Sequence, residues 1–389
     1  MQYATDPKSG NKLSVLGFGC MRFPRDRELT EKLIVDAASS GINYFDTAYI
    51  YGGSEVKLGL ILQKNTLRGK IHLATKLPHS KCKNYADFDR FFQEQLERLK
   101  TDYIDYYLIH NISAAAVWND LCTLGIERWI AEKKTNKQIR QMGFSFHGAQ
   151  SEFMALIDAY DWDFCQIQYN YMDENYQAGR AGLRRANEKG LAVIVMEPLL
   201  GGKLATGLPS KALKLFEETV ADRSAASWGL RWLWDQPEIT VVLSGMNSAR
   251  QLADNLKTAE EAKPGMLSEK ETAVYEPVIA VLRESYKVPC TGCNYCMPCL
   301  SGVNIPGCFA AYNTSYAMGF ISGITQYVTS TGANRPGNQN LASNCVKCGA
   351  CEEKCPQHIK ISESLTAVKK RMEPWWFKSV LRIARVFMS

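Results

Sequence analysis

Short apolar runs alternate with longer amphipathic stretches over the first two-thirds of the chain. The short runs are rich in Val, Ile, Tyr and Phe and are bounded by Gly or Pro, which is typical of strands buried on both faces. They predict strands at residues 13–19, 43–48, 72–77, 104–110, 141–146, 164–170, 192–198 and 240–246. Helical spacing of the apolar residues between them predicts helices that include residues 31–40, 85–100, 178–189 and 211–235.

The alternation of strand and helix favours an α/β fold, specifically a (β/α)8 TIM barrel. Eight such units in about 250 residues match the size of that barrel. A doubly wound sheet is the alternative, and it usually carries a glycine-rich phosphate fingerprint after its first strand. The first strand here leads into GFGCMR at residues 17–22, which lacks the third glycine. We therefore favour the barrel.

A polar hinge at residues 260–270 ends the barrel pattern, and a helix at residues 269–286 is predicted to follow it. We expect two domains, residues 1–265 and residues 266–389. Residues 329–340, which read TSTGANRPGNQN, have the composition of a surface loop in the second domain.

Composition and charge exclude several classes of protein. With 389 residues, 46% hydrophobic and 22% charged, the chain is globular and not disordered. The net charge is only +6, and most of it falls after residue 366, so the body gives no indication of nucleic-acid binding. The N-terminus does not resemble a signal peptide, and no run reaches the roughly 18 apolar residues of a membrane span. We expect a cytoplasmic protein with reduced thiols and no transmembrane segment.

The basic tail predicts an amphipathic helix. Its apolar face would hold Trp376, Val380, Ile383 and Phe387, with basic residues on another face. Such a helix could dock on the protein itself. Alternatively, it could contact an acidic electron-transfer protein or the periphery of an anionic membrane.

Four polar residues lie at or just after the ends of three predicted strands, at one rim of the barrel, where barrel chemistry is found. They are Asp46, Tyr51, Lys76 and His110. Burying Asp46 and Lys76 separately would be costly, so the two should pair. A lysine so placed would lower the pKa of the Tyr51 phenol below its usual value of ~10 and make it a general acid. His110 could orient the oxygen that receives the proton.

Most cysteines are concentrated in the second domain. Nine of the 13 lie between Cys290 and Cys355, which in a reducing compartment indicates metal ligands. Cys345-x2-Cys348-x2-Cys351-x3-Cys355-Pro matches the ligand run of bacterial ferredoxins, whereas zinc more often takes two separated CxxC pairs. A second run, from Cys290 to Cys299, precedes it and has one residue fewer before its final cysteine. The expected ligands are Cys290, Cys293, Cys296, Cys299, Cys345, Cys348, Cys351 and Cys355, which leaves Cys308 as a buried thiol.

The strings FDTAYIYGGSE, ATK, DYYLIH, GFS, CQIQYN, MEPLLGGKLA and LSGMNSARQLADN together resemble the aldo-keto reductases. The resemblance implies a catalytic tetrad of Asp46, Tyr51, Lys76 and His110. It also implies reduction of an aldehyde or ketone to an alcohol by hydride from NADPH or NADH, with the choice between them left open. The family's cofactor contacts fall on Ser145 and Gln166 for the nicotinamide carboxamide, Leu199, Gly201 and Lys203 for the pyrophosphate, and Asn247, Gln251, Asp254 and Asn255 near the adenosine. Met196 stands where an aromatic side chain often stacks on the nicotinamide, and Phe146 and His147 depart from the family's pattern after Ser145.

The second domain resembles a small α-helical ferredoxin with two [4Fe–4S] clusters. The resemblance implies an exchange of ligands, with Cys290, Cys293, Cys296 and Cys355 on one cluster and Cys345, Cys348, Cys351 and Cys299 on the other. The whole chain resembles the ferredoxin-fused branch of the aldo-keto reductases.

Three functions remain open for this combination. In the first, the protein is a reductase of small-molecule carbonyl substrates and its clusters serve only to stabilise the fold. They could instead exchange electrons with a ferredoxin- or flavin-type partner. Or the barrel could be a scaffold for an electron carrier without enzymatic activity. Hydride carries two electrons and a cubane passes one, so direct exchange between them would need a converter such as a flavin, and no flavin motif stands out.

Overall fold

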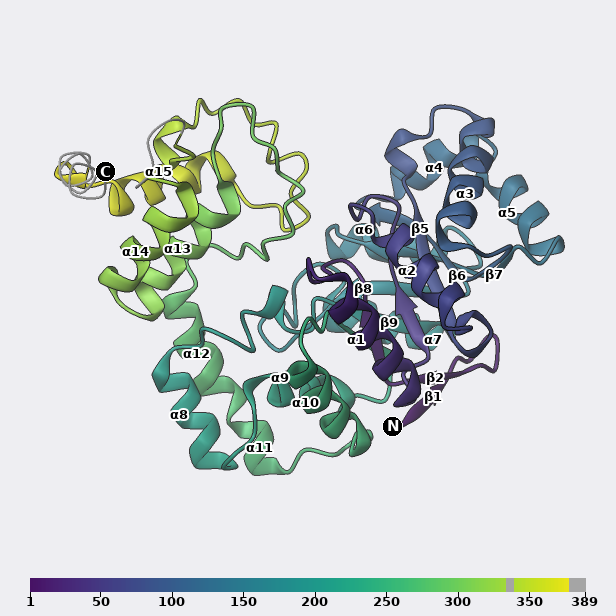
Figure 1. Cartoon of the computed structure of the whole chain (residues 1–389), viewed down its shortest axis with the longest axis horizontal. Helices are drawn as coiled ribbons and strands as arrows, with labels where there is room; N and C mark the ends of the chain where they lie inside the picture. The colour runs from purple at the N-terminus through teal and green to yellow at the C-terminus, as the bar shows by residue number, and fades with distance from the viewer. Residues whose placement is uncertain (334–338, 378–389) are drawn as a thin grey trace. The chain divides into compact units, whose positions relative to one another are not determined.

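The computed structural model describes residues 1–333 and 339–377, which form two compact units (Figure 1). The first unit contains Met1–Pro198 and Ala226–Ser268, and the second contains Leu199–Ala225 and the chain from Glu269 onward. The sequence placed the boundary between residues 265 and 266. The structure differs because Leu199–Ala225, a segment within the barrel sequence, packs with the second unit.

The first unit is a closed barrel of eight parallel strands, which confirms the predicted fold class. Each strand pairs with the next in the chain, and the last pairs with the first. The strands are β3 (Leu16–Gly19), β4 (Tyr44–Asp46), β5 (His72–Leu77), β6 (Ile104–Ile112), β7 (Ile139–Phe146), β8 (Phe164–Gln168), β9 (Ala192–Met196) and β10 (Val241–Ser244).

Helices cover the outside of this barrel (Figure 1). Their apolar faces form one core with the outward side chains of the strands, as Phe88, Phe92 and Leu96 on α3 illustrate. The helices are α1 (Arg27–Ser39), α2 (Ser54–Lys64), α3 (Tyr85–Leu99), α4 (Ala115–Thr123), α5 (Ile126–Thr135), α6 (Gln150–Asp158), α7 (Gly179–Glu188), α9 (Ala225–Trp234) and α10 (Ala249–Glu260), with short 3-10 turns at Arg68–Lys70 and His79–Lys81. A separate cluster that includes Tyr44, Tyr106 and Phe164 fills the barrel interior.

The predicted elements are wrong in two places within the barrel sequence. Residues 13–19 are not one strand, because β2 (Lys12–Ser14) pairs antiparallel with β1 (Tyr3–Thr5) and only β3 enters the barrel. Residues 211–235 are not one helix either. The chain breaks after α8 (Ser210–Thr219), where Asp222 has a φ of 61°, and α9 begins at Ala225.

The second unit is helical around its own small core. Besides α8 it contains α11 (Glu269–Ala273), α12 (Tyr275–Ser285), α13 (Ile305–Ala317), α14 (Phe320–Thr331) and α15 (Ile361–Met372), with 3-10 turns at Leu200–Gly202 and Ala342–Asn344. Helices α13, α14 and α15 pack side by side (Figure 1). The helix predicted at residues 269–286 is thus two helices, and the first residues of the loop predicted at 329–340 belong to α14, which continues to Thr331. Residues 334–338 of that predicted loop lie outside the described residues.

Only the start of the predicted tail helix belongs to the described residues. Trp376 packs edge-on against Phe320, and Phe377 is buried against Tyr327. The positions Val380, Ile383 and Phe387 lie outside the described residues. Among the helices that the structure describes, none is long and apolar enough to cross a membrane.

Candidate active site and cluster ligands

A buried ion pair lies where strands β4 and β5 end. Lys76 Nζ donates to Asp46 Oδ1 at 2.6 Å and Oδ2 at 2.8 Å, and to the carbonyl of Thr47 at 2.8 Å. Gln166 Nε2, from β8, donates to Asp46 Oδ2 at 3.0 Å. Asp46 and Lys76 are 4% and 1% exposed. The two residues therefore pair as the sequence predicts, and the ammonium has an oxygen acceptor for each of its protons.

Burial acts on both members of this pair. It raises the pKa of the Asp46 carboxyl, although Lys76 and Gln166 lower it. It also lowers the pKa of the Lys76 ammonium, which the charge of Asp46 opposes. Each charge would be costly alone in this site, and each is compensated chiefly by the other.

Tyr51 and His110 lie beside the pair. Tyr51 follows β4 in a turn in which its N–H donates to the carbonyl of Ala48 at 3.0 Å. Lys76 Nζ lies 5.1 Å from the centroid of the Tyr51 ring, and the rings of Tyr51 and His110 meet edge-on with centroids 5.7 Å apart. Burial lowers the pKa of His110 well below its usual value, and the nearby charge of Lys76 lowers it further. The structure therefore brings the four predicted residues together, with a neutral imidazole at pH 7.

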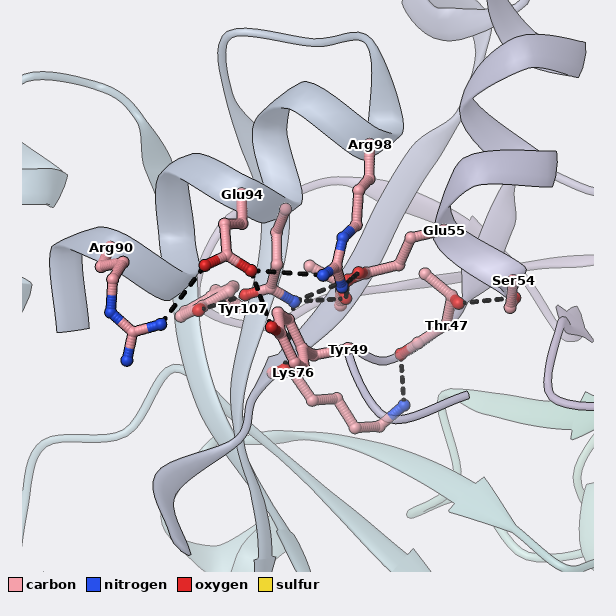
Figure 2. A network of polar contacts seen from close by, with 11 residues as sticks. Thr47, Tyr49, Ser54, Glu55, Lys76, Arg90, Glu94, Arg98 and Tyr107 are labelled. Atoms are coloured by element: carbon pink, nitrogen blue, oxygen red, sulfur yellow. Dashed lines mark hydrogen bonds and ion pairs between the residues drawn. The ribbon is translucent and has the colours of Figure 1, made fainter. Parts of the chain in front are cut away.

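A second buried network supports Lys76 from the helix layer (Figure 2). Glu55 on α2 accepts hydrogen bonds from Thr75 at 2.7 Å and Gln95 at 2.7 Å, and from Arg98 at 3.2 Å. Gln95 Nε2 also donates to the backbone carbonyl of Lys76 at 3.1 Å. Burial raises the pKa of the Glu55 carboxyl, and its three donors lower it. The sequence analysis missed this network, which ties α2 and α3 to the backbone of Lys76.

Buried acceptors suited to a carboxamide lie on Gln166, which was expected at the nicotinamide, and on Asn111, which bonds to the expected Ser145. Ser145 Oγ accepts from the backbone N–H of Asn111 at 2.7 Å. Gln166 Oε1 and Asn111 Oδ1 are buried atoms that accept no hydrogen bond among the described residues. A carboxamide NH2 group is a donor of matching chemistry, so these residues fit the group that the resemblance implies.

Asn111 itself was missed by the sequence analysis. It directly follows His110, at a point where the register between β6 and β7 shifts between Ile109 and Ile112, and its φ is 56°. Strained positions of this kind cluster at functional sites. A polar residue immediately after the strand-end histidine was the available signal.

A polar chain fixes the imidazole of His147, which follows β7. Gln168 donates to Asp173 at 2.8 Å, Gln177 donates to Gln168 at 2.8 Å, and His147 Nδ1 lies 3.1 Å from Gln177 Oε1. An ionised carboxylate only accepts hydrogen bonds, so both amides must point their NH2 groups toward Asp173. His147 must then carry its hydrogen on Nδ1.

The other expected cofactor residues fall in different places. Met196 ends β9 in the first unit. Asn255 on α10 donates to Ser244 Oγ at 2.8 Å, and Gln251 accepts from the backbone N–H of Asn247 at 2.8 Å. Asp254 lies on the same helix. The three pyrophosphate candidates, Leu199, Gly201 and Lys203, belong to the second unit.

The cysteines of the second unit gather into two groups. Burial raises the pKa of the Cys296 thiol to about 12, and neighbouring Cys290, Cys293 and Cys355 raise it as well. These are the four ligands expected for one cluster, with Cys355 contributed by the distant run. Among the described residues, no three His, Cys, Asp or Glu side chains form a site for a single metal ion.

The second group has the reciprocal composition. Burial raises the pKa of the Cys351 thiol, and Cys345 and Cys299 are among the groups that raise it further. Cys348, expected on the same cluster, is exposed. Thiols from both runs lie near one another in each group, so the residues fit [4Fe–4S] ligation. The number of clusters and the ligand set of each stay predictions. Cys308 is buried in the helical core, as expected.

Comparison with known proteins gives the class of this fold and site. Residues 15–265 match the model of the aldo/keto reductase family, and residues 289–359 match that of a 4Fe-4S dicluster domain. The chain belongs to the aldo/keto reductase family and is an oxidoreductase with a C-terminal dicluster domain, which confirms the resemblance found in the sequence.

Individual relatives agree with this assignment. The chain is 25% identical to the uncharacterized oxidoreductase YrpG of Bacillus subtilis, over 67% of this chain and 91% of that protein. It is 25% identical to D-galacturonate reductase of Fragaria ananassa, over 61% and 79%. The holo form of the aldo-keto reductase AKR11C1 from Bacillus halodurans superimposes with a TM-score of 0.60 at 26% identity, covering 72% of this chain and 96% of that one.

Proposed function

We propose that the protein reduces the carbonyl group of a small aldehyde or ketone to an alcohol, using hydride from NADPH or NADH. The observation that carries the proposal is the buried Asp46–Lys76 pair, whose ammonium lies near the Tyr51 ring while His110 meets the edge of that ring.

Each member of the tetrad has a distinct task in this reaction. Tyr51 donates its hydroxyl proton to the carbonyl oxygen as that oxygen gains negative charge. The Lys76 ammonium stabilises the phenolate that remains, and Asp46 keeps the ammonium charged and in place. His110 is neutral at pH 7, so it can hydrogen-bond the carbonyl oxygen without supplying a second positive charge.

The cofactor provides the hydride when it is bound, and the chain orients it. Gln166 and Asn111 would accept hydrogen bonds from the carboxamide NH2 through their unsatisfied oxygens. The roles of Ser145 and Met196 at the nicotinamide, of Leu199, Gly201 and Lys203 at the pyrophosphate, and of Asn247, Gln251, Asp254 and Asn255 at the adenosine stay predictions from the resemblance.

The test is the variant Tyr51→Phe. We expect a loss of about 10²–10⁴-fold in kcat for NADPH-dependent reduction of a panel of aldehydes and ketones, because the proton donor is removed. NADP⁺ binding, measured by fluorescence titration, should be unchanged. Tyr49→Phe is the matched control, because the Tyr49 hydroxyl donates instead to Glu94 on α3. Full activity of Tyr51→Phe would refute the mechanism.

A second candidate function is electron exchange with a ferredoxin- or flavin-type partner. The exposure of Cys348 favours this function. So does the exposure of two apolar residues next to expected cluster ligands, because Leu300 is 93% exposed and Val346 is 69% exposed. Turnover of a carbonyl substrate driven by reduced ferredoxin or methyl viologen without nicotinamide would support this function. Retention of NADPH-dependent reduction in a folded variant with Cys345→Ser and Cys348→Ser would favour a structural role for that cluster.

A further inference from the structure

A loop of the barrel sequence contacts the first cluster-ligand segment. Both belong to the second unit. Lys203 Nζ donates a hydrogen bond to the backbone carbonyl of Cys290, and the backbone carbonyl of Lys203 accepts one from the Tyr286 hydroxyl at 3.1 Å. The ammonium of a residue predicted to bind the cofactor pyrophosphate is therefore placed beside a cluster ligand.

Backbone contact at Gly201 holds the same two segments together. Gly201 has a φ of 68°, and a Cβ added there would lie 2.2 Å from the carbonyl oxygen of Thr291. Only glycine fits without separating the segments. Gly202 also has a positive φ, of 95°, but an added Cβ there would meet no atom within 4 Å.

The rest of the inserted segment is equally tied to the second unit. Helix α8 packs against α12. Arg223 forms an ion pair with Glu271, and both side chains are largely buried. The position of the Lys203 loop thus depends on the fold that carries the cysteines.

We propose that Lys203, within residues 199–203, interacts both with the pyrophosphate of the nicotinamide cofactor and with the cluster ligated by Cys290. Binding of the pyrophosphate and reduction of the cluster then affect each other. The pyrophosphate half of this inference rests on the proposed function. A positive charge beside a cluster stabilises its reduced, more negative form and raises its reduction potential. A bound pyrophosphate competes for the same ammonium, so it lowers that potential. By linkage, reduction of the cluster weakens binding of the pyrophosphate by the same free energy.

The first experiment measures the cluster alone. Anaerobic holoprotein is titrated with dithionite and followed by EPR in the wild type, Lys203→Met and Lys203→Arg. We expect the potential of one cluster to fall in Lys203→Met and to stay near the wild-type value in Lys203→Arg, which keeps the charge. Lys270→Met is the matched control. Lys270 is an exposed lysine of the same unit whose Nζ reaches the carbonyls of Glu218 and Thr219.

The second experiment measures the linkage. The ligand is 2′-phospho-ADP-ribose, which has the pyrophosphate but no reactive nicotinamide, and adenosine 2′,5′-bisphosphate is the control without a pyrophosphate bridge. We expect 2′-phospho-ADP-ribose to bind more weakly to reduced than to oxidised protein. Each tenfold difference in affinity corresponds to a fall of 59 mV in cluster potential for one electron. The difference should vanish in Lys203→Met and should be absent with the control ligand.

The outcomes separate this inference from the proposed function. An unchanged cluster potential in Lys203→Met, or iron-free protein, would overturn the inference whatever the barrel reduces. A lowered potential in Lys203→Met without any effect of 2′-phospho-ADP-ribose would overturn the pyrophosphate half. Gly201→Ala should weaken the linkage more than Gly202→Ala, because only the first forces the two segments apart. Equal effects would contradict the role of the contact.

Discussion

Replacing Lys76 with Met removes one partner of the buried ion pair and leaves the Asp46 charge behind. Asp46 loses the donor that lies 2.6 and 2.8 Å from its two oxygens, and Thr47 loses a donor to its carbonyl, while Gln166 remains. Removing one member of a buried pair costs about 3–5 kcal/mol. We expect a loss of this size for Lys76→Met, measured as the free energy of opening β4 and β5.

Hydrogen exchange measured by mass spectrometry is the suitable assay, because the two units need not unfold in a single transition. Peptides that cover residues 44–46 and 72–77 report on the two strands. The double variant Asp46→Asn/Lys76→Met should recover much of the loss, since it leaves no buried charge.

Lys32→Met is the control for loss of a lysine charge at the surface. Lys32 pairs with Asp36 at 2.9 Å, but the side chains are 66% and 41% exposed, so the expected cost is below about 1 kcal/mol. A cost for Lys76→Met as small as that of Lys32→Met would refute the argument that the pair is buried and mutually dependent.

Three further predictions follow from the site and the cluster segments. Gln95→Leu removes the hydrogen bonds to Glu55 and to the Lys76 carbonyl, so kcat should fall about ten- to a hundredfold. Gln63→Leu, at an exposed position of α2, should leave kcat unchanged. Equal kcat values for the two variants would contradict the positioning role of Gln95. The folded-state pKa of His110 is lowered, so below the unfolded-state pKa of ~6.5 the unfolded chain binds more protons than the folded chain. Hydrogen exchange of peptides from β6 should show the free energy of opening falling as pH falls below that value, by up to about 1.4 kcal/mol per pH unit for this group. His110→Gln should reduce this slope, and an unchanged slope would show that the folded-state pKa of His110 is not lowered. Removing iron anaerobically with a chelator should expose residues 288–304 and 339–360 to limited proteolysis while the barrel stays protected, because the ligand cysteines pack on the helical core. An unchanged cleavage pattern would mean that the clusters do not stabilise the second unit.

The barrel and the tetrad could be predicted because both depend on local pattern. Buried strands give apolar runs, and Asp46, Lys76 and His110 each end such a run, so parallel strands must bring them to one rim. The cysteine runs are equally local, since their spacing alone indicates cluster ligands.

What the sequence could not provide depends on contacts between distant segments. Gln95 lies on a helical face that reads as ordinary core, and only the packing of α3 against α2 shows that it meets Glu55 and Lys76. Gly201 lies within a family motif, yet the structure places it against Thr291. The barrel pattern continues across Leu199–Ala225, so nothing local indicates that this segment packs with the helical unit.

Deuterium transfer tests the proposed chemistry most directly. The holoprotein would reduce a ketone with NADPH that carries deuterium at both C4 positions, and the alcohol would be analysed by mass spectrometry and NMR. Direct hydride transfer beside Tyr51 predicts one deuterium on the carbinol carbon. An alcohol formed without deuterium at that carbon would contradict this account and point to electrons delivered through the clusters.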